Sequence, residues 1–566
     1  MKKRLLSVLV ALAVVFTVTA CTIQNQDDPT KTTITVVNYD GGIGGGWLVG
    51  AVERFEEAYK DESFADGKTG VKVKVTNDSI VSATTMKNSG YNIYFDETSA
   101  VESAINAGNV MPIDDIVGPL ESKIDVDYRN MLKGNDGKYY ALPHYEFYPG
   151  ATYDVDVFEK YGLYIADGTD GDYFDSEKFG EEMYFTKGTG VGQPKKSCGP
   201  DGIYGTIDDG LPSSLLELCI LCEYMKERKS VTPFQLSGMY AGYSNYFLMG
   251  LWASLAGFDE MRTVYTFDGT IDAVTGEGSE NLFPGISYVK KPTTEKVTVQ
   301  EGNGYRAFDS VNRYYAEAFL QICLKEGWIN SDSTDTSVTH TGAQSRFING
   351  YKNGSPIGII MEGSYWYNES DLAGNFDNYY NNYATDDSER RLAWLSLPIS
   401  FDTKVTEGNG KPITVVDQGL SFAYINNNIA AKPEVVAACK AFLSFLYTDA
   451  ELAAFTASTG LFKAGLSYKI DDSELEKFPY YKQSLYNYRQ SGKIIWCGAD
   501  NQTFRSSKTT LVLRNTHFTI SNLSVNGVNQ GQVIKALRNN CGLYDVFVAG
   551  KLSKGIWQSM CQVDVI

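Results

Sequence analysis

Histidine is scarce in this sequence. Only His144, His340 and His517 occur among the 566 residues. Because histidine is the usual proton relay near neutral pH and a common metal ligand, this scarcity argues against a histidine-driven enzyme and against histidine-rich metal sites. The hydrolase signatures GxSxG and HExxH are missing as well. The sequence therefore contains no recognisable catalytic motif.

Basic residues are fewer than acidic ones. The chain contains 50 Lys and Arg but 69 Asp and Glu, which gives a formal net charge of −19. Binding of nucleic acid through bulk charge needs an excess of positive residues, so this balance excludes it. With 43% apolar and 21% charged residues, the composition is that of a folded globular protein and not of a disordered chain or a coiled coil.

Cysteine is too sparse for a disulfide scaffold, with nine residues in the whole chain. The single CxxC, Cys219 and Cys222, lies in SSLLELCILCEYMKER, where apolar residues repeat at helical spacing. No second CxxC completes a zinc site and no βαβ context surrounds this one. We expect both thiols to pack in a protein core.

Long hydrophobic runs are confined to the N-terminus. Lys2, Lys3 and Arg4 precede an uncharged apolar run from Leu5 to Val18, which is the arrangement of an export signal. No later apolar stretch reaches the 18 residues that a membrane-spanning helix needs. The alternative interpretation of residues 1–20 is a single N-terminal membrane helix.

The end of this segment, Val18-Thr19-Ala20-Cys21, resembles the bacterial lipobox. The resemblance implies that residues 1–20 are a lipoprotein signal peptide and that Cys21 receives a diacylglycerol. The polar residues 21–33 are then a flexible tether. We expect the mature protein at the outer face of the bacterial cytoplasmic membrane, held by its lipid anchor.

The first organised unit begins after this tether. Residues 34–37 form a buried-strand pattern, residues 40–46 a glycine-rich turn, and the following residues one apolar face of a helix. Strand patterns recur at 71–75 and, after a helical stretch, at 91–95. The order β-α-β-α-β predicts a parallel α/β sheet with its ligand at the carboxyl ends of the strands. A nucleotide site is not expected, because the turn matches neither GxGxxG nor GxxxxGK[ST].

The rest of the chain alternates helices with turn-rich insertions. Extended residues from 139 lead into a short helix at 157–161, and no fixed-period repeat suggests a solenoid or propeller. Two α/β lobes of unequal size account best for this pattern. Further helices are predicted at 213–228, 244–256, 311–326, 433–456 and 530–539, and long insertions at 162–212, 259–305, with a hairpin-like TVYTFDGTIDAV, and 402–414.

Four blocks in order resemble the extracellular solute-binding proteins of carbohydrate ABC transporters, the maltose-binding-protein-like type. They are VVNYDGGIGGGWL, LPHYEFYPGATYDVDVFEKYGL, RFINGYKNGSPIGIIMEGSYWYNE and DQGLSFAYINNNIAAKPEVVAACKAFLSFLYTDAELAAF. The block that starts at Leu142 resembles the family's first crossing between lobes, except that Asp154 replaces the usual Asn, and the block that starts at Asp417 resembles its late crossing. With the lipobox, the resemblance covers residues 21 to about 465; the insertions and the tail after 466 depart from shorter members.

The resemblance implies a periplasmic-binding-protein-like α/β fold, in which two lobes surround a ligand cleft and are joined by hinge crossings. The N-terminal lobe would comprise residues 34–147 and 419–465, and the C-terminal lobe residues 148–418 and 466–566. The implied function is capture of a sugar or oligosaccharide by lobe closure and its delivery to a membrane-embedded ABC permease, without chemistry on the ligand and without a required cofactor. We expect a monomer in solution.

Sugar chemistry favours the same function. Sugars present apolar C–H faces and many hydroxyls, so a sugar site needs aromatic rings for stacking and carboxylates or amides for hydrogen bonds. The chain contains 38 Tyr, 28 Phe and 7 Trp. The candidate ligand-binding residues stand at turns, strand ends and crossings: Tyr39, Trp47, Asp96, Glu97, Tyr145, Glu146, Tyr243, Tyr365, Trp366, Asp417 and Trp496.

Two acidic loops are candidate calcium sites, because hard cations bind clustered oxygen ligands. The loop at 199–210 places Asp201, Asp208 and Asp209 among glycine turns, but it lacks the EF-hand spacing. Structural calcium is therefore an expectation for this loop. The second cluster is typical of a soluble surface loop: Asp167, Asp170, Asp172, Asp175 and Glu177.

Two other functions remain open from the sequence. A surface glycoside hydrolase needs two carboxylates about 5–10 Å apart across the sugar, and these are candidates: Asp96, Glu97, Glu146 and Asp417. A glycan-adhesion lipoprotein would bind through the long insertions. Turnover of an oligosaccharide separates the hydrolase from the receptor, and stabilisation by a small sugar separates the receptor from the adhesin.

Overall fold

The computed structural model describes residues 28–39, 41–78, 82–97, 101–190, 192–386, 388–419, 421–496 and 523–561. The predicted signal peptide, Cys21 and most of the tether lie outside these residues. The described chain folds as two compact units: unit 1 contains residues 28–146 and 419–470, and unit 2 contains residues 147–418, 471–496 and 523–561. The sequence analysis placed the corresponding boundaries at 147, 418 and 465.

Unit 1 is built on a five-stranded sheet. The strand order is β2-β1-β3-β14-β4, with β1 parallel to β2 and β3, and β14 antiparallel to β3 and β4. Residues of β1 alternate between buried and half-buried before a buried run, as expected for a strand covered on both faces. The strands are β1 (Thr32–Tyr39), β2 (Val71–Asp78), β3 (Ile93–Asp96), β4 (Leu142–Pro143) and β14 (Phe422–Ile425).

Helix α2 (Gly46–Ala58) follows the glycine-rich turn and buries the apolar face that the sequence predicted, including Leu48, Val52 and Phe55. Between β2 and β3 the described residues form only the 3-10 helix η1 (Met86–Asn88), so the longer helix expected there is wrong. The other helices of unit 1 are α3 (Val101–Asn106), α4 (Asp114–Val117), η2 (Gly118–Lys123), α5 (Val126–Arg129), η3 (Asn130–Leu132), η7 (Asn427–Ile429), α13 (Pro433–Leu446) and α14 (Asp449–Thr459).

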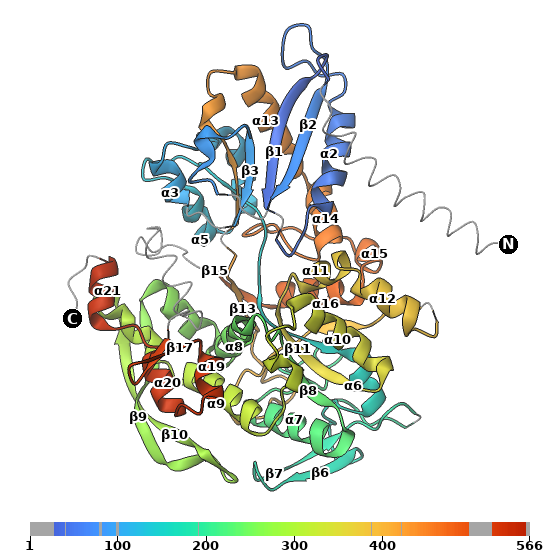
Figure 1. Ribbon diagram of the computed structural model, residues 1–566, viewed down its shortest axis with the longest axis vertical. Helices are drawn as coiled ribbons and strands as arrows, with labels where there is room; N and C mark the ends of the chain where they lie inside the picture. The colour runs from blue at the N-terminus through green and yellow to red at the C-terminus, as the bar shows by residue number, and fades with distance from the viewer. Residues whose placement is uncertain are drawn as a thin grey trace, which may run out of the picture. The chain divides into compact units, whose positions relative to one another are not determined.

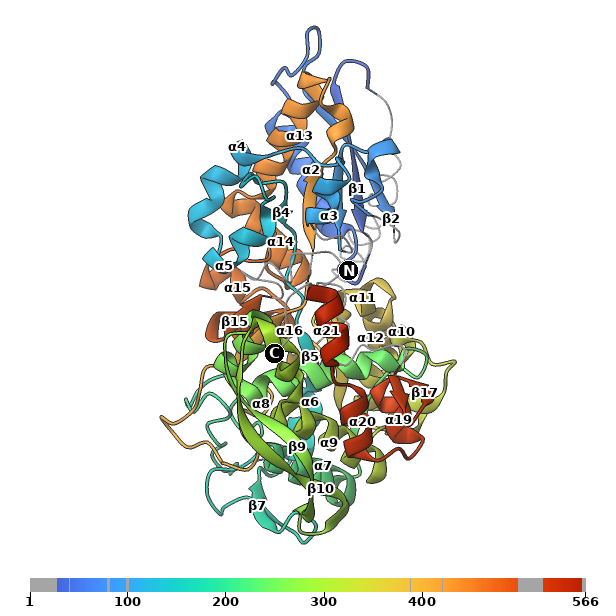
Figure 2. The same ribbon diagram turned by 90° about the vertical axis from the view of Figure 1, so that its left-hand side faces the viewer.

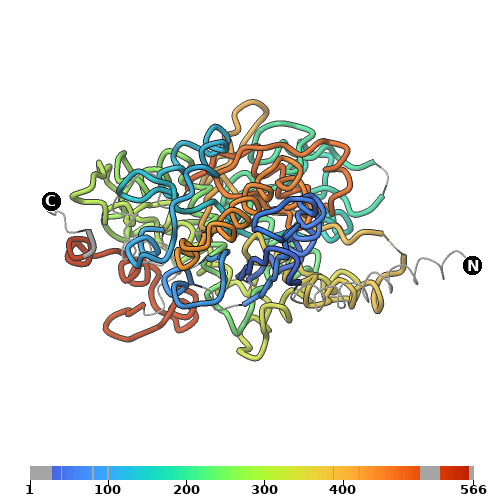
Figure 3. Tube along the Cα trace, turned by 90° about the horizontal axis from the view of Figure 1, so that it is seen from above, coloured from blue at the N-terminus to red at the C-terminus, as the bar shows by residue number. Residues whose placement is uncertain are grey.

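Two distant segments of the chain complete unit 1. Helix α13 lies beside β1, and Figures 1 and 3 show the orange segment of α13 and α14 next to the blue N-terminal one. An ion pair between Arg54 Nε and Glu451 Oε1, 2.6 Å long, joins α2 to α14. The helix predicted at 433–456 is broken into α13 and α14 at residues 447–448, where Tyr447 leaves the helical conformation.

Unit 2 is centred on a four-stranded sheet of order β12-β5-β11-β8. Strand β11 is parallel to β8 and antiparallel to β5, and every residue of β5 and β11 is buried. These strands are β5 (Pro149–Asp154), β8 (Thr232–Gln235), β11 (Ile357–Gly363) and β12 (Leu392–Trp394), with β13 (Thr414–Asp417) and β15 (Lys493–Trp496) paired separately in parallel.

Helices surround this sheet. In α7 (Leu215–Lys229), Cys219 and Cys222 are fully buried free thiols, which confirms the prediction of packed core cysteines. Within the described residues no helix is long and apolar enough to cross a bilayer. The remaining helices are α6 (Val155–Tyr161), η4 (Ala241–Tyr243), α8 (Ser244–Thr266), η5 (Glu301–Asp309), α9 (Val311–Lys325), η6 (Ser331–Thr334), α10 (His340–Asn353), α11 (Trp366–Leu372), α12 (Asn375–Asn382), α15 (Asp472–Leu475), α16 (Tyr480–Ser491), α19 (Val533–Arg538), α20 (Leu543–Ala549) and α21 (Lys554–Cys561).

The described residues of unit 2 include three antiparallel hairpins. The longest joins β9 (Gly269–Phe283) to β10 (Ile286–Val299) and curves along one side in Figure 2. The hairpin predicted at 263–274 is wrong in position, because α8 continues to Thr266 and Phe267, with a φ of 55°, ends it. The other hairpins pair β6 (Asp172–Ser176) with β7 (Glu181–Phe185) and β16 (Leu523–Val525) with β17 (Val528–Gly531). These sheets and helices confirm a mixed α/β fold.

Candidate functional site

Polar and aromatic residues gather at the carboxyl edge of the unit 1 sheet. Strand β1 ends at Tyr39 and β3 at Asp96, and parallel strands bring their carboxyl ends to one edge. A Cβ added at Gly41 would overlap the Tyr39 ring and stand 3.1 Å from Glu97 Oε1, so the turn backbone lies between these two side chains. The structure thus brings Tyr39 and Glu97 together. Asp96 is buried, and its Oδ2 accepts a hydrogen bond from Ala83 N at 2.5 Å.

Trp47 belongs to a buried aromatic box in unit 1. Its ring centroid lies 5.2 Å from those of Phe95, His144 and Phe455. Lys463 Nζ sits in the box, 4.4 Å from the Trp47 centroid and 3.0 Å from His144 Nδ1. No carboxylate among the described residues pairs with this ammonium group. Trp47 therefore packs against a buried amine in this conformation.

Burial shifts the pKa of both titratable groups in this box. Loss of solvation lowers the pKa of Lys463 well below its usual value, because the charged amine has no carboxylate to stabilise it. Burial, and then the nearby Lys463, lowers the pKa of His144. Sequence reasoning missed the pair, although the scarcity of histidine made His144 conspicuous.

The predicted residues near the first crossing are largely buried. Tyr145 packs edge-on against His144, with the centroids 5.0 Å apart, and Glu146 N donates to Phe462 O at 2.9 Å. In unit 2, Asp417 Oδ1 accepts from Phe147 N at 2.8 Å. Asp417 and Trp496 are register partners on β13 and β15, so these two candidates lie side by side.

Five aromatic side chains of unit 2 lie in a row, which is a candidate ligand site; we call it the aromatic row. Successive ring centroids are 5.7 Å apart for Tyr240 and Tyr243, 5.4 Å for Tyr243 and Tyr246, 5.1 Å for Tyr246 and Phe147, and 5.3 Å for Phe147 and Tyr365. Tyr240 is 44% exposed. The row thus runs from a solvent-exposed ring to the buried end of β11.

Local geometry explains how the row forms. Tyr240, Tyr243 and Tyr246 recur every third residue through η4 and the first turn of α8, which places them on one face. A Cβ at Gly363 would overlap the Phe147 ring, so the glycine at the end of β11 makes room for it. Tyr243 and Tyr365 were predicted as ligand-binding residues from the sequence, whereas Tyr240, Tyr246 and Phe147 were not. The spacing of the three tyrosines was the signal that could have found them.

Trp366 lies apart from the row. It is fully buried, its Nε1 donates to Thr152 Oγ1 at 2.8 Å, and its ring packs against Phe347 and Tyr481. A ligand has no access to this ring in the described conformation. Trp366 is thus a core side chain, whereas its neighbour Tyr365 belongs to the row.

Four polar residues adjoin the aromatic row, and none was named from the sequence. Gln344 Nε2 donates to Glu369 Oε2 at 2.7 Å and to Glu362 Oε1 at 3.5 Å. His340 Nε2 is 3.3 Å from Glu369 Oε1, and its ring lies 5.3 Å from that of Tyr240. Glu362 is fully buried, and its Oε2 has no hydrogen-bond partner among the described residues.

The electrostatics of these groups follow from burial and from each other. Burial, and then the charge of Glu369, raises the pKa of Glu362 well above its usual value. The hydrogen bond with Glu369 raises the pKa of His340. Burial and the nearby glutamates also raise the pKa of Tyr243, which stays a neutral hydroxyl. The site therefore offers aromatic faces beside neutral and charged hydrogen-bonding groups.

In the candidate calcium loop the carboxylates bond to their own loop. Asp208 accepts from Asp201 N at 3.1 Å and from Thr206 Oγ1 at 2.6 Å, and Gly205 N donates to Asp209 Oδ2 at 2.8 Å. Burial and the charge of Asp201 raise the pKa of Asp208 to about 7. In the described part of the chain, no group of three or more His, Cys, Asp or Glu side chains is arranged to hold a metal ion. Calcium at this loop stays a prediction.

In the second acidic cluster two of the carboxylates pair with cations. Asp172 Oδ2 is 2.9 Å from Lys229 Nζ, and Asp167 Oδ2 is 3.5 Å from Lys195 Nζ. Asp167 also accepts a hydrogen bond from Tyr204 at 2.6 Å. These contacts are those of ordinary surface loops.

No family model matches the sequence, and no curated protein matches it. Many solved structures are similar to it, and two of them are described here. The binding protein MsmE of Bacillus subtilis, in an open conformation, has 14% identity and a TM-score of 0.49, with 93% of this chain and 97% of that chain covered. A chitin oligosaccharide binding protein has 12% identity and a TM-score of 0.49, with 92% of this chain and 99% of the other covered. Sequence identities this low do not identify the ligand of this chain.

Proposed function

We propose that this chain is a lipid-anchored extracytoplasmic solute-binding protein. It captures a sugar or oligosaccharide by closure of its two lobes and delivers it to an ABC permease in the bacterial cytoplasmic membrane. The aromatic row of unit 2 is the observation that carries the proposal. The lipobox-like residues 18–21 support the anchor, and the absence of a hydrolytic motif supports a ligand released unchanged.

The row suits a sugar because its two kinds of surface match those of a pyranose. Aromatic faces stack against the apolar C–H faces of the ring, while polar groups beside them bond its hydroxyls. His340 and Glu369 adjoin the exposed end at Tyr240, and Glu362 adjoins the inner end near Tyr365. Since the row comprises five rings, it matches an oligosaccharide better than a single sugar unit.

A thermal-shift screen tests this function. The chain from Thr22 onward is heated with mono- and oligosaccharides, and a ligand that binds only the native state raises the melting temperature by mass action. We expect one class of oligosaccharide to give a saturable rise. Tyr243→Ala should remove most of it, because the ring that joins Tyr240 to the rest of the row is lost.

Tyr173→Ala is the matched control. Tyr173 is 49% exposed and its ring is tilted against that of Tyr184 in the β6–β7 hairpin, so its removal deletes an exposed tyrosine outside the row. Retention of the sugar response in this variant and its loss in Tyr243→Ala support the row as the binding surface. An equal response in both variants contradicts it, and no response to any sugar favours the adhesin.

The hydrolase alternative now has a specific pair of carboxyl groups. Glu362 and Glu369 share the Gln344 amide, and Glu362 has the raised pKa that a general acid needs. Mass spectrometry of the sugar recovered after incubation separates the two functions. Intact sugar supports the receptor, and cleavage that is lost in both Glu362→Gln and Glu369→Gln establishes a hydrolase.

A further inference from the structure

Unit 2 contains a cavity of about 250 Å³ between the ends of helices α9 and α19 and the segment leading into η6. Its wall is formed by nine residues: Cys323, Leu324, Lys325, Ile329, Asn330, Thr334, Leu537, Arg538 and Asn540. Two of them are cations and none is a carboxylate. The chain as a whole carries 69 acidic and 50 basic residues, so a purely cationic wall is unusual for it.

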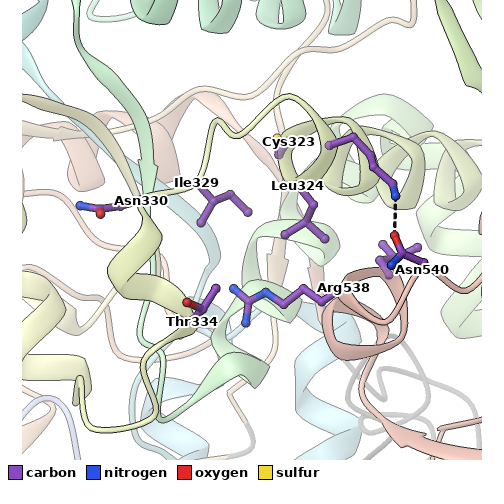
Figure 4. A pocket seen from close by; sticks show the side chains of 9 residues that line it. Cys323, Leu324, Ile329, Asn330, Thr334, Arg538 and Asn540 are labelled. Atoms are coloured by element: carbon purple, nitrogen blue, oxygen red, sulfur yellow. Dashed lines mark hydrogen bonds between the residues drawn. The ribbon is translucent and has the colours of Figure 1, made fainter.

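Arg538 is the central group of this wall. In Figure 4 its side chain extends from α19 into the cavity toward Thr334, below Leu324. The guanidinium is half-buried, and Nη2 donates to Ser333 O at 3.1 Å. Its Nε is buried and has no hydrogen-bond partner among the described residues. A buried N–H donor without an acceptor costs free energy that a ligand oxygen would recover.

No carboxylate of the described chain forms an ion pair with Arg538. Burial alone lowers the pKa of its guanidinium, yet arginine keeps its charge in proteins. Seven other arginines of the described residues do pair with carboxylates: Arg54, Arg129, Arg306, Arg313, Arg346, Arg390 and Arg391.

Lys325 and Asn540 give the wall further hydrogen-bond donors. Lys325 Nζ is held by Asn540 Oδ1 at 2.6 Å, the dashed line in Figure 4, which leaves the Asn540 amide hydrogens for a ligand. Asn330 Oδ1 accepts from Asp332 N at 3.3 Å, so its amide hydrogens remain as well. Thr334 Oγ1 donates to Ser331 O at 2.7 Å.

Three backbone carbonyls of wall residues are already bonded. Cys323 O accepts from Trp328 N at 2.8 Å and Leu324 O from Gly327 N at 3.4 Å. At the end of α19, Leu537 O accepts from Asn540 N at 3.1 Å. Unsatisfied donors and a net positive charge therefore face the cavity, which is the environment that an anion requires.

We propose that this cavity is a binding site for a small oxyanion, a phosphoryl or carboxylate group, separate from the aromatic row. The planar guanidinium of Arg538 can bind two oxygens of such a group, with Lys325 as the second positive charge and the Asn540 amide as a further donor. A buried water needs about 10–15 Å³ of space, so the cavity also admits an organic residue attached to the anion.

Calorimetric titration of the chain from Thr22 onward tests the site, with inorganic phosphate and succinate as probes and sodium chloride matching the ionic strength. We expect saturable binding of at least one probe, and the active probe identifies the oxyanion. Arg538→Gln should raise the dissociation constant at least about tenfold, because hydrogen bonds to a charged group contribute about 1.5–3 kcal/mol to binding.

Lys535→Gln is the matched control, because it removes one positive charge from the exposed face of the same helix. Its dissociation constant should equal that of the unmodified chain. Lys325→Gln, an exposed lysine in the wall, gives a second test that does not depend on the folding of Arg538→Gln. The proposal is overturned if neither probe binds saturably, or if Arg538→Gln and Lys325→Gln bind as tightly as Lys535→Gln.

Discussion

Replacement of Lys463 by methionine probes the buried box of unit 1. The amine lies among aromatic rings, with its Nζ 4.1 Å from the Phe455 centroid and 3.0 Å from His144 Nδ1, and no carboxylate of the described chain compensates its charge. Methionine has a similar length and a thioether that packs well against aromatic rings. Lys463→Met therefore removes the titration of this amine while retaining most of its packing.

The expected signature is a change in how stability depends on pH. Burial holds the pKa of Lys463 well below 10.5, so between these values the unfolded chain binds a proton that the folded chain does not. The free energy of unfolding of the unmodified chain then rises with pH by about 1.4 kcal/mol per unit in this window. The variant lacks this contribution, so its stability relative to the unmodified chain falls by the same amount per unit as pH rises.

Other effects of the substitution do not depend on pH in this range. His144 loses the partner of its Nδ1, which costs about 1–3 kcal/mol for a buried group. Because burial lowers the pKa of His144 from 6.5, the ring is neutral in both folded and unfolded chains above pH 7.5. The slope of the unfolding free energy against pH therefore reports the titration of the Lys463 amine alone. The absolute difference in stability also includes the effects on packing and on His144.

Urea unfolding at pH 7.5, 8.5 and 9.5 measures this slope. Trp47 is the one tryptophan of residues 28–146 and 419–470. When the chain is labelled with fluorotryptophan, the fluorine NMR signal of Trp47 therefore reports the unfolding of unit 1 alone. Lys60→Met, which removes a lysine of the same unit whose side chain is 56% exposed, should leave the pH profile as it is in the unmodified chain. If the profiles of Lys463→Met and the unmodified chain are parallel, Lys463 is charged in the folded protein and the reasoning fails.

Three further outcomes are expected. Arg390→Ala should destabilise unit 2 by about 3–5 kcal/mol in urea unfolding, because it leaves Asp154 buried without its cation; an effect below about 1 kcal/mol would contradict this. Between pH 3.8 and about 7 the Asp208 carboxyl keeps its proton in the folded chain but not in the unfolded chain, so the unmodified chain should lose stability on the order of 1 kcal/mol per pH unit as pH rises. Asp208→Asn should remove this pH dependence, and thermal unfolding at pH 5 and pH 8 measures it. If the loop binds calcium, a chelator should lower the melting temperature of the unmodified chain and leave that of Asp208→Asn unchanged.

Much of the secondary structure followed from local pattern. The alternation of residues 71–75 and the apolar face of Leu48, Val52 and Phe55 correspond to β2 and α2 in the structure. Both signals repeat within a few residues, so they do not depend on distant parts of the chain. The misplaced hairpin at 263–274 is the converse case, because a second helical segment of α8, after the non-helical Gly257, runs through residues of high β propensity.

The candidate sites were only partly accessible from sequence. Tyr243 and Tyr365 could be named because aromatic residues at turn ends suit a sugar, but the same argument selected Trp366, which lies in the core. Gln344, Glu362 and Glu369 are indistinguishable from ordinary residues of helices and a strand until the fold places them in contact. The donor-lined cavity is a similar case, because Arg538 and Leu324 are more than 200 residues apart in the sequence.

The sequence by itself determined the acidic balance, the apolar N-terminal segment, the mixed α/β class and the supply of aromatic residues, since each is a property of composition or of short-range periodicity. Tertiary structure alone decided which side chains meet. His144 and Lys463 are 319 positions apart, and no local pattern predicts that burial will bring a histidine and an uncompensated amine to 3.0 Å. The pKa values of such groups depend on what surrounds them in the folded chain, because solvation and charge act through space.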